Sequence, residues 1–209
     1  FPETGKDLRF YAEDGSELPF HIESWDPDGE SAVWVGVPSL SDATTVTMLI
    51  GDPTHDNFPT YTTDSSTWQN SPYVSVWNLD EAAGESRRDV KSGLDADPVG
   101  NVQQVPGVVG QGAAFDGSDG DTRLQSGTNL HPEHKLTTSL HIEGWMWINS
   151  GADFKKRELL SQDNPYHKGR GYRLRFMDNQ VARFSIGDNS GSGNGAARVK
   201  NEVTYDGGV

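Results

Sequence analysis

Turn-forming residues punctuate this chain from end to end, and this feature constrains its fold more than any other. Clusters of Gly, Pro, Asp, Asn, Ser and Thr recur about every ten residues. Between them apolar and polar residues alternate, and no window carries the apolar spacing of an amphipathic helix over three turns. The pattern predicts an all-β protein of short antiparallel strands.

In the first part of the chain, the sequence pattern predicts four strands, at residues 7–14, 18–25, 31–38 and 44–51. Apolar residues at every second position give two of these strands one apolar face each: Leu18, Phe20 and Ile22, and then Val33, Val35 and Val37. Asp-Gly and Asp-Pro-Asp-Gly sequences supply residues that tolerate tight turns. We therefore predict an antiparallel meander.

The same stretch resembles a protein family. It reads DLRFYAEDGSELPFHIESW and then AVWVGVPSLSDATT, which is similar to the domain of unknown function DUF2341. Because that family has further strands before DLRF, the resemblance implies that residues 1–55 form a partial β domain. Its open sheet edge would be covered by another chain, such as a neighbouring subunit.

Residues 56–72 are rich in Asp, Thr, Ser, Asn and Pro and show no periodic run, which predicts an extended linker. The linker carries Phe58, Tyr61 and Trp68, and so many aromatic side chains are unusual in a free linker. We expect it to lie against one or both neighbouring domains.

A second β domain is predicted over residues 73–209. At residues 136–148, apolar Leu140, Ile142, Met146 and Ile148 recur at every second position, as in a strand with one face on a core. Further strands are predicted at residues 158–162, 171–176 and 180–188.

This second region also resembles a family. The string VVGQGAAFDG at 108–117, the later LTTSLHIEGWMWI and the opening YVSVWNLDE at 73–81 are similar to three strands of the laminin-G-like, concanavalin A-type lectin domain, so the resemblance implies a strand at each. The resemblance implies a concanavalin A-like jelly roll that is incomplete at its C-terminal end. The whole chain is then expected to hold two antiparallel β-sandwich domains and to be a piece of a longer protein.

Composition narrows the classes of partner. The chain has 31 acidic and 17 basic residues, a formal charge of -14, which disfavours nucleic acid and other polyanions. It has no cysteine, so disulfides and thiolate metal sites are excluded. No apolar run approaches the length of a membrane span, and no membrane insertion is predicted.

Calcium is the cofactor that the acidic loops favour, because hard cations take carboxylate and carbonyl oxygens. The candidate ligands lie in two loops: Asp89, Asp95, Asp97 and Asn101 in one, and Asp116, Asp119 and Asp121 in the other. The lectin resemblance adds that many such domains hold a structural calcium ion. The alternative is that these residues form solvated turns that cap their own backbone.

Exposed aromatic and polar side chains would carry ligand binding. The predicted ligand contacts are Trp147, Arg173, Arg175, Asn189 and Asn194. Trp145 matches the usual tryptophan of the lectin family and is expected to pack in the core, whereas core packing and exposure remain alternatives for Trp147.

Catalytic patterns are not found. Sandwich glycosidases carry several acidic residues on one strand, whereas the strand predicted here has only Glu143. His131, His134 and His167 do not form a zinc-spaced set. We therefore predict that the chain is not an enzyme.

The leading functional prediction is a non-catalytic binding or adhesion module of a secreted or surface protein, either extracellular or periplasmic. Its lectin-like half would bind a glycan or a protein ligand. One alternative is a structural repeat or assembly unit of a fibre or adhesin, as a homo-oligomer or beside neighbouring domains. The other is a targeting module of a larger carbohydrate-active enzyme.

Overall fold

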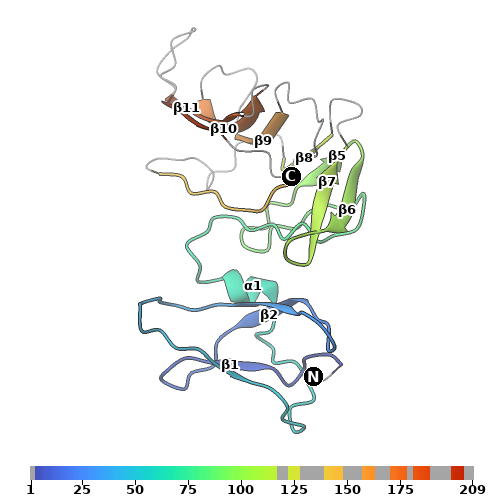
Figure 1. Ribbon diagram of the computed structural model, residues 1–209, viewed down its shortest axis with the longest axis vertical. Coiled ribbons are helices and arrows are strands. Elements are labelled where there is room, and N and C mark those ends of the chain that lie inside the picture. Colours follow the sequence, from blue (N-terminus) through green and yellow to red (C-terminus); the bar gives the residue numbers. More distant parts are fainter. Residues whose placement is uncertain are drawn as a thin grey trace. The chain divides into compact units, whose positions relative to one another are not determined.

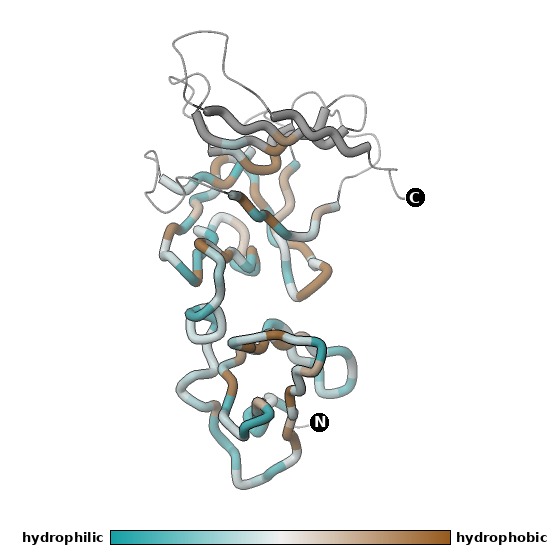
Figure 2. Tube along the Cα trace, turned by 90° about the vertical axis from the view of Figure 1, so that its left-hand side faces the viewer, coloured by the Kyte–Doolittle hydropathy of each residue, from teal (hydrophilic) through white to brown (hydrophobic). Residues whose placement is uncertain are grey.

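The chain forms two compact units, residues 1–128 and 129–209, and each is considered by itself. A computed structural model gives the fold (Figure 1). It describes residues 3–116, 122–127, 139–147, 157–162, 170–177, 181–188 and 199–204. Hydrophobic and hydrophilic stretches alternate along the trace in Figure 2, as expected of short strands joined by polar turns.

The first unit holds eight short strands and one helical turn among its described residues. They are β1 (Arg9–Tyr11), β2 (Phe20–Ser24), β3 (Ala32–Val35), β4 (Thr47–Leu49), α1 (Asp64–Trp68), β5 (Asp97–Val99), β6 (Val102–Pro106), β7 (Gln111–Phe115) and β8 (Arg123–Gln125). The prediction of an all-β protein is confirmed. The sandwich and jelly-roll arrangements remain predictions.

The first four strands fall within the predicted ranges, but their pairing corrects the predicted meander. β2 pairs with β3, and β1 pairs with β4, both antiparallel. The first strand therefore lies beside the last. This pairing encloses one apolar core, whereas four strands in sequential order would leave one face of the sheet open.

Four buried residues form that core: Leu8, Phe10, Leu18 and Phe20. The rings of Phe10 and Phe20 meet edge to face, with centroids 5.2 Å apart. The valines of the second predicted apolar face and Ile22 pack against this cluster. The period of two in the sequence thus identified the core correctly.

The predicted linker docks through two of its three aromatic residues. Tyr61 packs edge to face on Phe20, with centroids 6.5 Å apart, and its hydroxyl donates to the Glu17 carboxylate. Burial and that hydrogen bond raise the pKa of Tyr61. Trp68 contacts Trp34 of β3, with centroids 5.3 Å apart.

The helix within the linker was not predicted. α1 is a single turn, beginning after the N-cap residue Thr63, whose hydroxyl accepts from the Ser66 amide at 3.0 Å. It covers the face of β2 and β3 that points away from the core. Figure 1 shows α1 beside β2.

The later part of the first unit consists of two strand pairs. β6 and β7 form an antiparallel hairpin, and β5 pairs with β8. Of the strand predicted at 108–117, residues 111–115 are confirmed as β7. Residues 73–81 instead form only an isolated bridge, between Trp77 and Asp89, so the strand predicted there is wrong.

Four strands are described in the second unit: β9 (Arg157–Gln162), β10 (Arg170–Met177), β11 (Val181–Asp188) and β12 (Val199–Thr204). They form one antiparallel sheet in the order β12-β11-β10-β9. The first three confirm predicted strands, and β12 was not predicted. Tyr172 is buried on β10, and burial raises its pKa.

The strand predicted at 136–148 is not formed over its described residues. Residues 139–147 do not form a strand. Trp145 is 78% exposed, so the expectation that it packs in the core is wrong. Alternation describes the two faces of a strand but does not supply a hydrogen-bonding neighbour, and no described strand pairs with these residues.

Candidate functional site

A polar cleft of about 280 Å³ opens beside β2 in the first unit. Three segments that are distant in sequence line it: β2, the docked linker and the loop at 78–80. The lining residues are His21, Ile22, Glu23, Phe58, Thr62, Thr63, Asp64, Asn78 and Asp80.

The floor of the cleft is a histidine and carboxylate pair on the outer face of β2. Phe20 and Ile22 point to the core, so His21 and its opposite residue Trp34 point the other way, and the hydrogen bond from Trp34 places Glu23 on that same outer face. His21 Nε2 and Glu23 Oε2 lie 3.4 Å apart. Trp34 Nε1 donates to the same Glu23 oxygen at 3.1 Å, which fixes the carboxylate in place.

The walls add hydroxyl, amide and carboxylate groups. Arg88 donates to Asp64, which anchors that carboxylate to the loop after residue 80. Gln104 donates to the Asp80 carbonyl and fixes the backbone there. The Phe58 side chain is 43% exposed at the rim, in contrast to the two docked linker aromatics.

Two polar atoms of the lining are buried without a hydrogen-bond partner among the described residues. They are Nδ1 of His21 and the hydroxyl oxygen of Thr62. A buried polar atom without a partner costs about 1–3 kcal/mol. Such a cost is common at sites that bind ligands, where stability is exchanged for function.

The chemistry of the cleft suits a neutral ligand with several hydroxyl groups. Carboxylates accept hydrogen bonds from hydroxyls, Asn78 can donate and accept, and the Phe58 ring offers an apolar face. Three carboxylates, Glu23, Asp64 and Asp80, repel an anionic ligand. Among the residues that the structure describes, no three acidic or histidine side chains are placed to hold a metal ion.

The described candidate calcium ligands make hydrogen bonds within the protein. Asp95 accepts from the Asp89 amide at 3.0 Å, and the Ser86 hydroxyl donates to Asp97. Asn101 of the first loop donates to Asp116 of the second loop at 2.8 Å. Asp119 and Asp121 lie outside the described residues, and the calcium site remains a prediction.

Asp89 is the most constrained of these residues. It is buried, and its Oδ1 accepts from the amides of Val76, Lys91 and Ser92 at 3.0–3.1 Å. Burial alone would raise the pKa of Asp89, but hydrogen bonds from Ser92, Ser75 and these amides outweigh it and lower the pKa. This is the arrangement of a carboxylate that caps its own turn.

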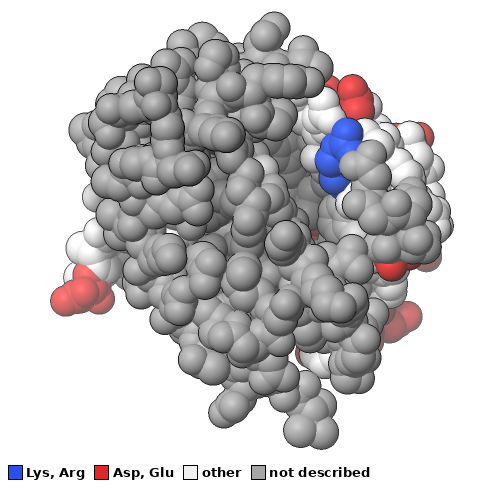
Figure 3. Space-filling view, turned by 90° about the horizontal axis from the view of Figure 1, so that it is seen from above, with Lys and Arg blue, Asp and Glu red and all other residues white. Residues whose placement is uncertain are grey.

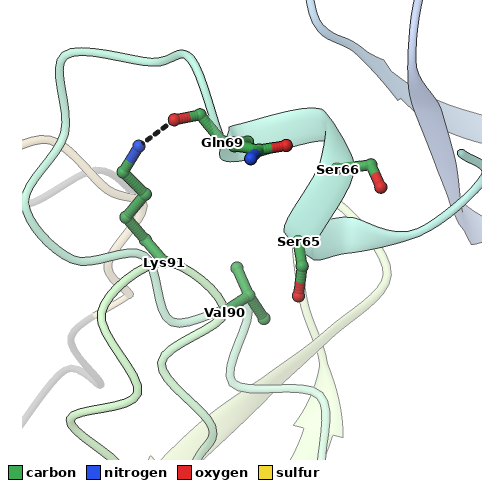
Figure 4. Close-up of a pocket in the computed structure, with 5 residues that line it drawn as sticks. All are labelled: Ser65, Ser66, Gln69, Val90 and Lys91. Carbon is green, nitrogen blue, oxygen red and sulfur yellow. Dashed lines mark hydrogen bonds between the residues drawn. The ribbon is translucent and has the colours of Figure 1, made fainter.

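A second hollow, of about 440 Å³, lies beside α1 (Figure 4). Lys91 points toward the C-terminal end of the helix and donates to the carbonyls of Trp68, at 3.0 Å, and Gln69. The lysine therefore satisfies carbonyls that the helix end leaves open. Its role here is to attach α1 to the 89–93 turn.

The predicted ligand contacts of the second unit are only partly described. Trp147 is 79% exposed. Arg173 and Arg175 lie on β10, where the structure describes their backbone only. Asn189 and Asn194 lie outside the described residues. Their role in binding remains a prediction.

The cleft was not predicted from the sequence. The available signal was a polar pair, His21 and Glu23, inside a strand whose other face is apolar. Trp34, which donates to this pair, and the cleft residues Phe58 and Asp64 are distant in sequence, and the sequence does not indicate that they lie on this side of β2.

Comparison with known proteins bears on the first part of the chain. Residues 4–66 match the family model DUF2341, "Domain of unknown function". The DUF2341 resemblance is therefore confirmed, and the matched segment extends through most of α1. It contains β1 to β4, the core and the His21 and Glu23 pair, whereas Asn78 and Asp80 follow it in the chain.

No curated protein matches the chain. Among solved structures, the S-layer domain-containing protein (residues 221–444) of Clostridium thermocellum ATCC 27405 is similar, with 15% identity and a TM-score of 0.49. The match covers 65% of this chain and 59% of that chain. The lectin-like resemblance of the second region remains a prediction.

No helix in the described part of the chain has the length and apolar character needed to cross a membrane. On the face drawn in Figure 3, the described acidic side chains lie at separate points rather than in one patch.

Proposed function

We propose that this chain is a non-catalytic binding module of a secreted or cell-surface protein, and that its polar cleft binds a glycan. The observation that supports this proposal is the lining of the cleft: fixed carboxylates, an amide and hydroxyls beside the exposed ring of Phe58. Sugars present hydroxyls at their edges and apolar C–H faces, which such a lining complements. The excess of carboxylates favours neutral sugars over acidic ones.

The cleft predicts a specific mutational result. Phe58→Ala and Asp80→Asn should each weaken binding of a neutral glycan by about tenfold or more, because each removes one ligand contact. A glycan array on the whole chain would identify the ligand, and titration calorimetry would measure its affinity for the variants. Val108→Ala is the matched control, since Val108 is exposed and does not line the cleft.

Two results would contradict the cleft as the glycan site. One is an array without any bound neutral glycan. The other is binding that Phe58→Ala and Asp80→Asn leave unchanged but Trp147→Ala abolishes, which would move the site to the second unit.

Calcium binding at the acidic loops is also proposed. Asp116, held by Asn101 and by the Thr122 hydroxyl at 3.2 Å, is the described candidate ligand nearest in sequence to Asp119 and Asp121. A ligand that binds only the native state stabilises it by about 2.7 kcal/mol when the free ligand concentration is one hundred times the Kd. Millimolar calcium should therefore raise the thermal midpoint by several degrees over a chelator. Asp116→Asn should remove the shift, and equal midpoints in the wild type would contradict the proposal.

A second candidate function is a structural or assembly unit of a surface fibre or adhesin. The specific observation that favours it is the exposure of apolar side chains along β4, where Met48 and Leu49 are about half exposed. Apolar strand edges pair with other strands.

A further inference from the structure

The strand β4 lies at the edge of its sheet. It pairs with β1 on one side, with Arg9 opposite Leu49, Phe10 opposite Met48 and Tyr11 opposite Thr47. No described strand pairs with its other side. An edge of this kind presents backbone N–H and C=O groups that another strand can use.

The apolar core is open at this edge. Residues directly opposite each other in an antiparallel pair point to the same face, so Met48 points to the face of the buried Phe10. Met48 is nevertheless 54% exposed, and Val46, two residues earlier on the same face, is 37% exposed. Ile50, next on that face, packs against the core. The opening is therefore confined to one end of the strand.

The edge lacks the charged and proline residues that often prevent strand addition. Residues 44–51, TTVTMLIG, contain no charged residue and no proline. Lysines, prolines and inward-pointing charges are the common protections of an edge strand. This neutral segment is exposed over residues 44–49 in a chain of net charge -14.

We propose that β4 pairs with β4 of a second copy of this chain, antiparallel and about a two-fold axis. Charge favours this occupant. The general surface of two copies is acidic and repels, whereas two copies that meet through β4 place an uncharged strand against an uncharged strand. A basic partner is not favoured at this strand, because residues 44–51 contain no carboxylate to pair with its positive charges. A two-fold contact also uses the same strand twice and closes on itself.

The core faces set the register of this pairing. The open core faces of the two copies lie on the same side of the joined sheet only if even-numbered residues of one strand are opposite even-numbered residues of the other. A slip of one residue would place the two core faces on opposite sides. With Thr47 opposite its own copy, Val46 of each chain lies opposite Met48 of the other. The four apolar side chains then cover both openings.

This proposal does not depend on the glycan cleft, because no residue of β4 lines the cleft. If the pairing of β4 is disproved, the proposed glycan site is unaffected, and the reverse also holds. The two are tested by different measurements, ligand affinity for the cleft and molecular mass for the edge.

The first experiment is sedimentation equilibrium of the whole chain across a range of concentrations. The wild type should form a reversible dimer, and Met48→Lys should weaken it by about tenfold or more, because it places a charge opposite the apolar Val46 of the other copy and brings two like charges to diagonal positions on one face of the joined sheet. Leu40→Lys is the matched control, since Leu40 is exposed and lies outside any strand. Thermal unfolding and circular dichroism verify that Met48→Lys folds.

A second experiment keeps the wild-type apolar side chains and tests the register. The chain has no cysteine, so a single introduced cysteine can only cross-link to its copy. Opposite residues of paired strands lie about 4.5–5.5 Å apart at Cα, which suits a disulfide. Thr47→Cys should give a disulfide-linked dimer under mild oxidation, faster than Leu40→Cys.

Three outcomes would overturn the proposal. A monomer at every concentration, with equal cross-linking of both cysteine variants, would show that β4 does not pair with its copy. A dimer that Met48→Lys leaves intact would place the interface elsewhere. Growth into filaments would exclude the two-fold contact.

Discussion

Phe20→Ala is expected to lower the free energy of unfolding by about 3–5 kcal/mol. Phe20 is 0% exposed, and its ring contacts those of Phe10 and Tyr61. Removing the ring deletes buried apolar surface and leaves a cavity where the first strands meet the docked linker. Because small domains are stable by only about 5–15 kcal/mol, this loss is a large share of the total.

Urea unfolding followed by tryptophan fluorescence would measure this loss, since Trp25 packs against the same core. Leu40→Ala is the control, because Leu40 is exposed and its truncation should change stability by no more than about 0.5 kcal/mol. If the two variants lost equal stability, the core would not be organised around Phe20.

Asp89→Ala should cost on the order of 3 kcal/mol, because it leaves several buried amide groups without an acceptor. The Asp89 carboxylate joins the segment at 75–77 to the turn at 89–93 through its contacts with Val76 and Ser92. Thermal or urea unfolding at neutral pH would measure the change. Asp97→Asn is the control, since Asp97 is exposed and accepts from the Ser86 hydroxyl only at the surface.

The stabilisation by Asp89 should also depend on pH. Its folded pKa is lowered, against about 3.9 for an unfolded aspartate. The contribution is therefore complete above about pH 4 and is lost as the pH falls through the folded pKa. The stability difference between wild type and Asp89→Asn should shrink below pH 4. A constant difference from pH 7 to pH 2 would contradict the assignment.

Sequence patterns identified much of the fold. The alternation around Phe20 and Val35 located two paired strands and their core face, and β9, β10 and β11 fell where alternation indicated. The same reasoning failed at Trp145, because alternating residues become a strand only when a neighbour supplies the hydrogen bonds. It also failed at α1, whose single turn is too short for an apolar period to appear.

The candidate sites were less predictable. Aspartates in the turns were read as calcium ligands or backbone caps, and only the folded chain shows that Asp89 accepts from backbone amides. The cleft was missed because His21 and Asp80 are far apart in sequence. The sequence by itself determined the short strands, their turns, the apolar face of β2 and the acidic surface, since these depend on residues close together in the chain. The tertiary structure decided that β1 pairs with β4, that the linker packs on Trp34 and that a polar cleft forms beside β2, because long-range packing brings these segments together.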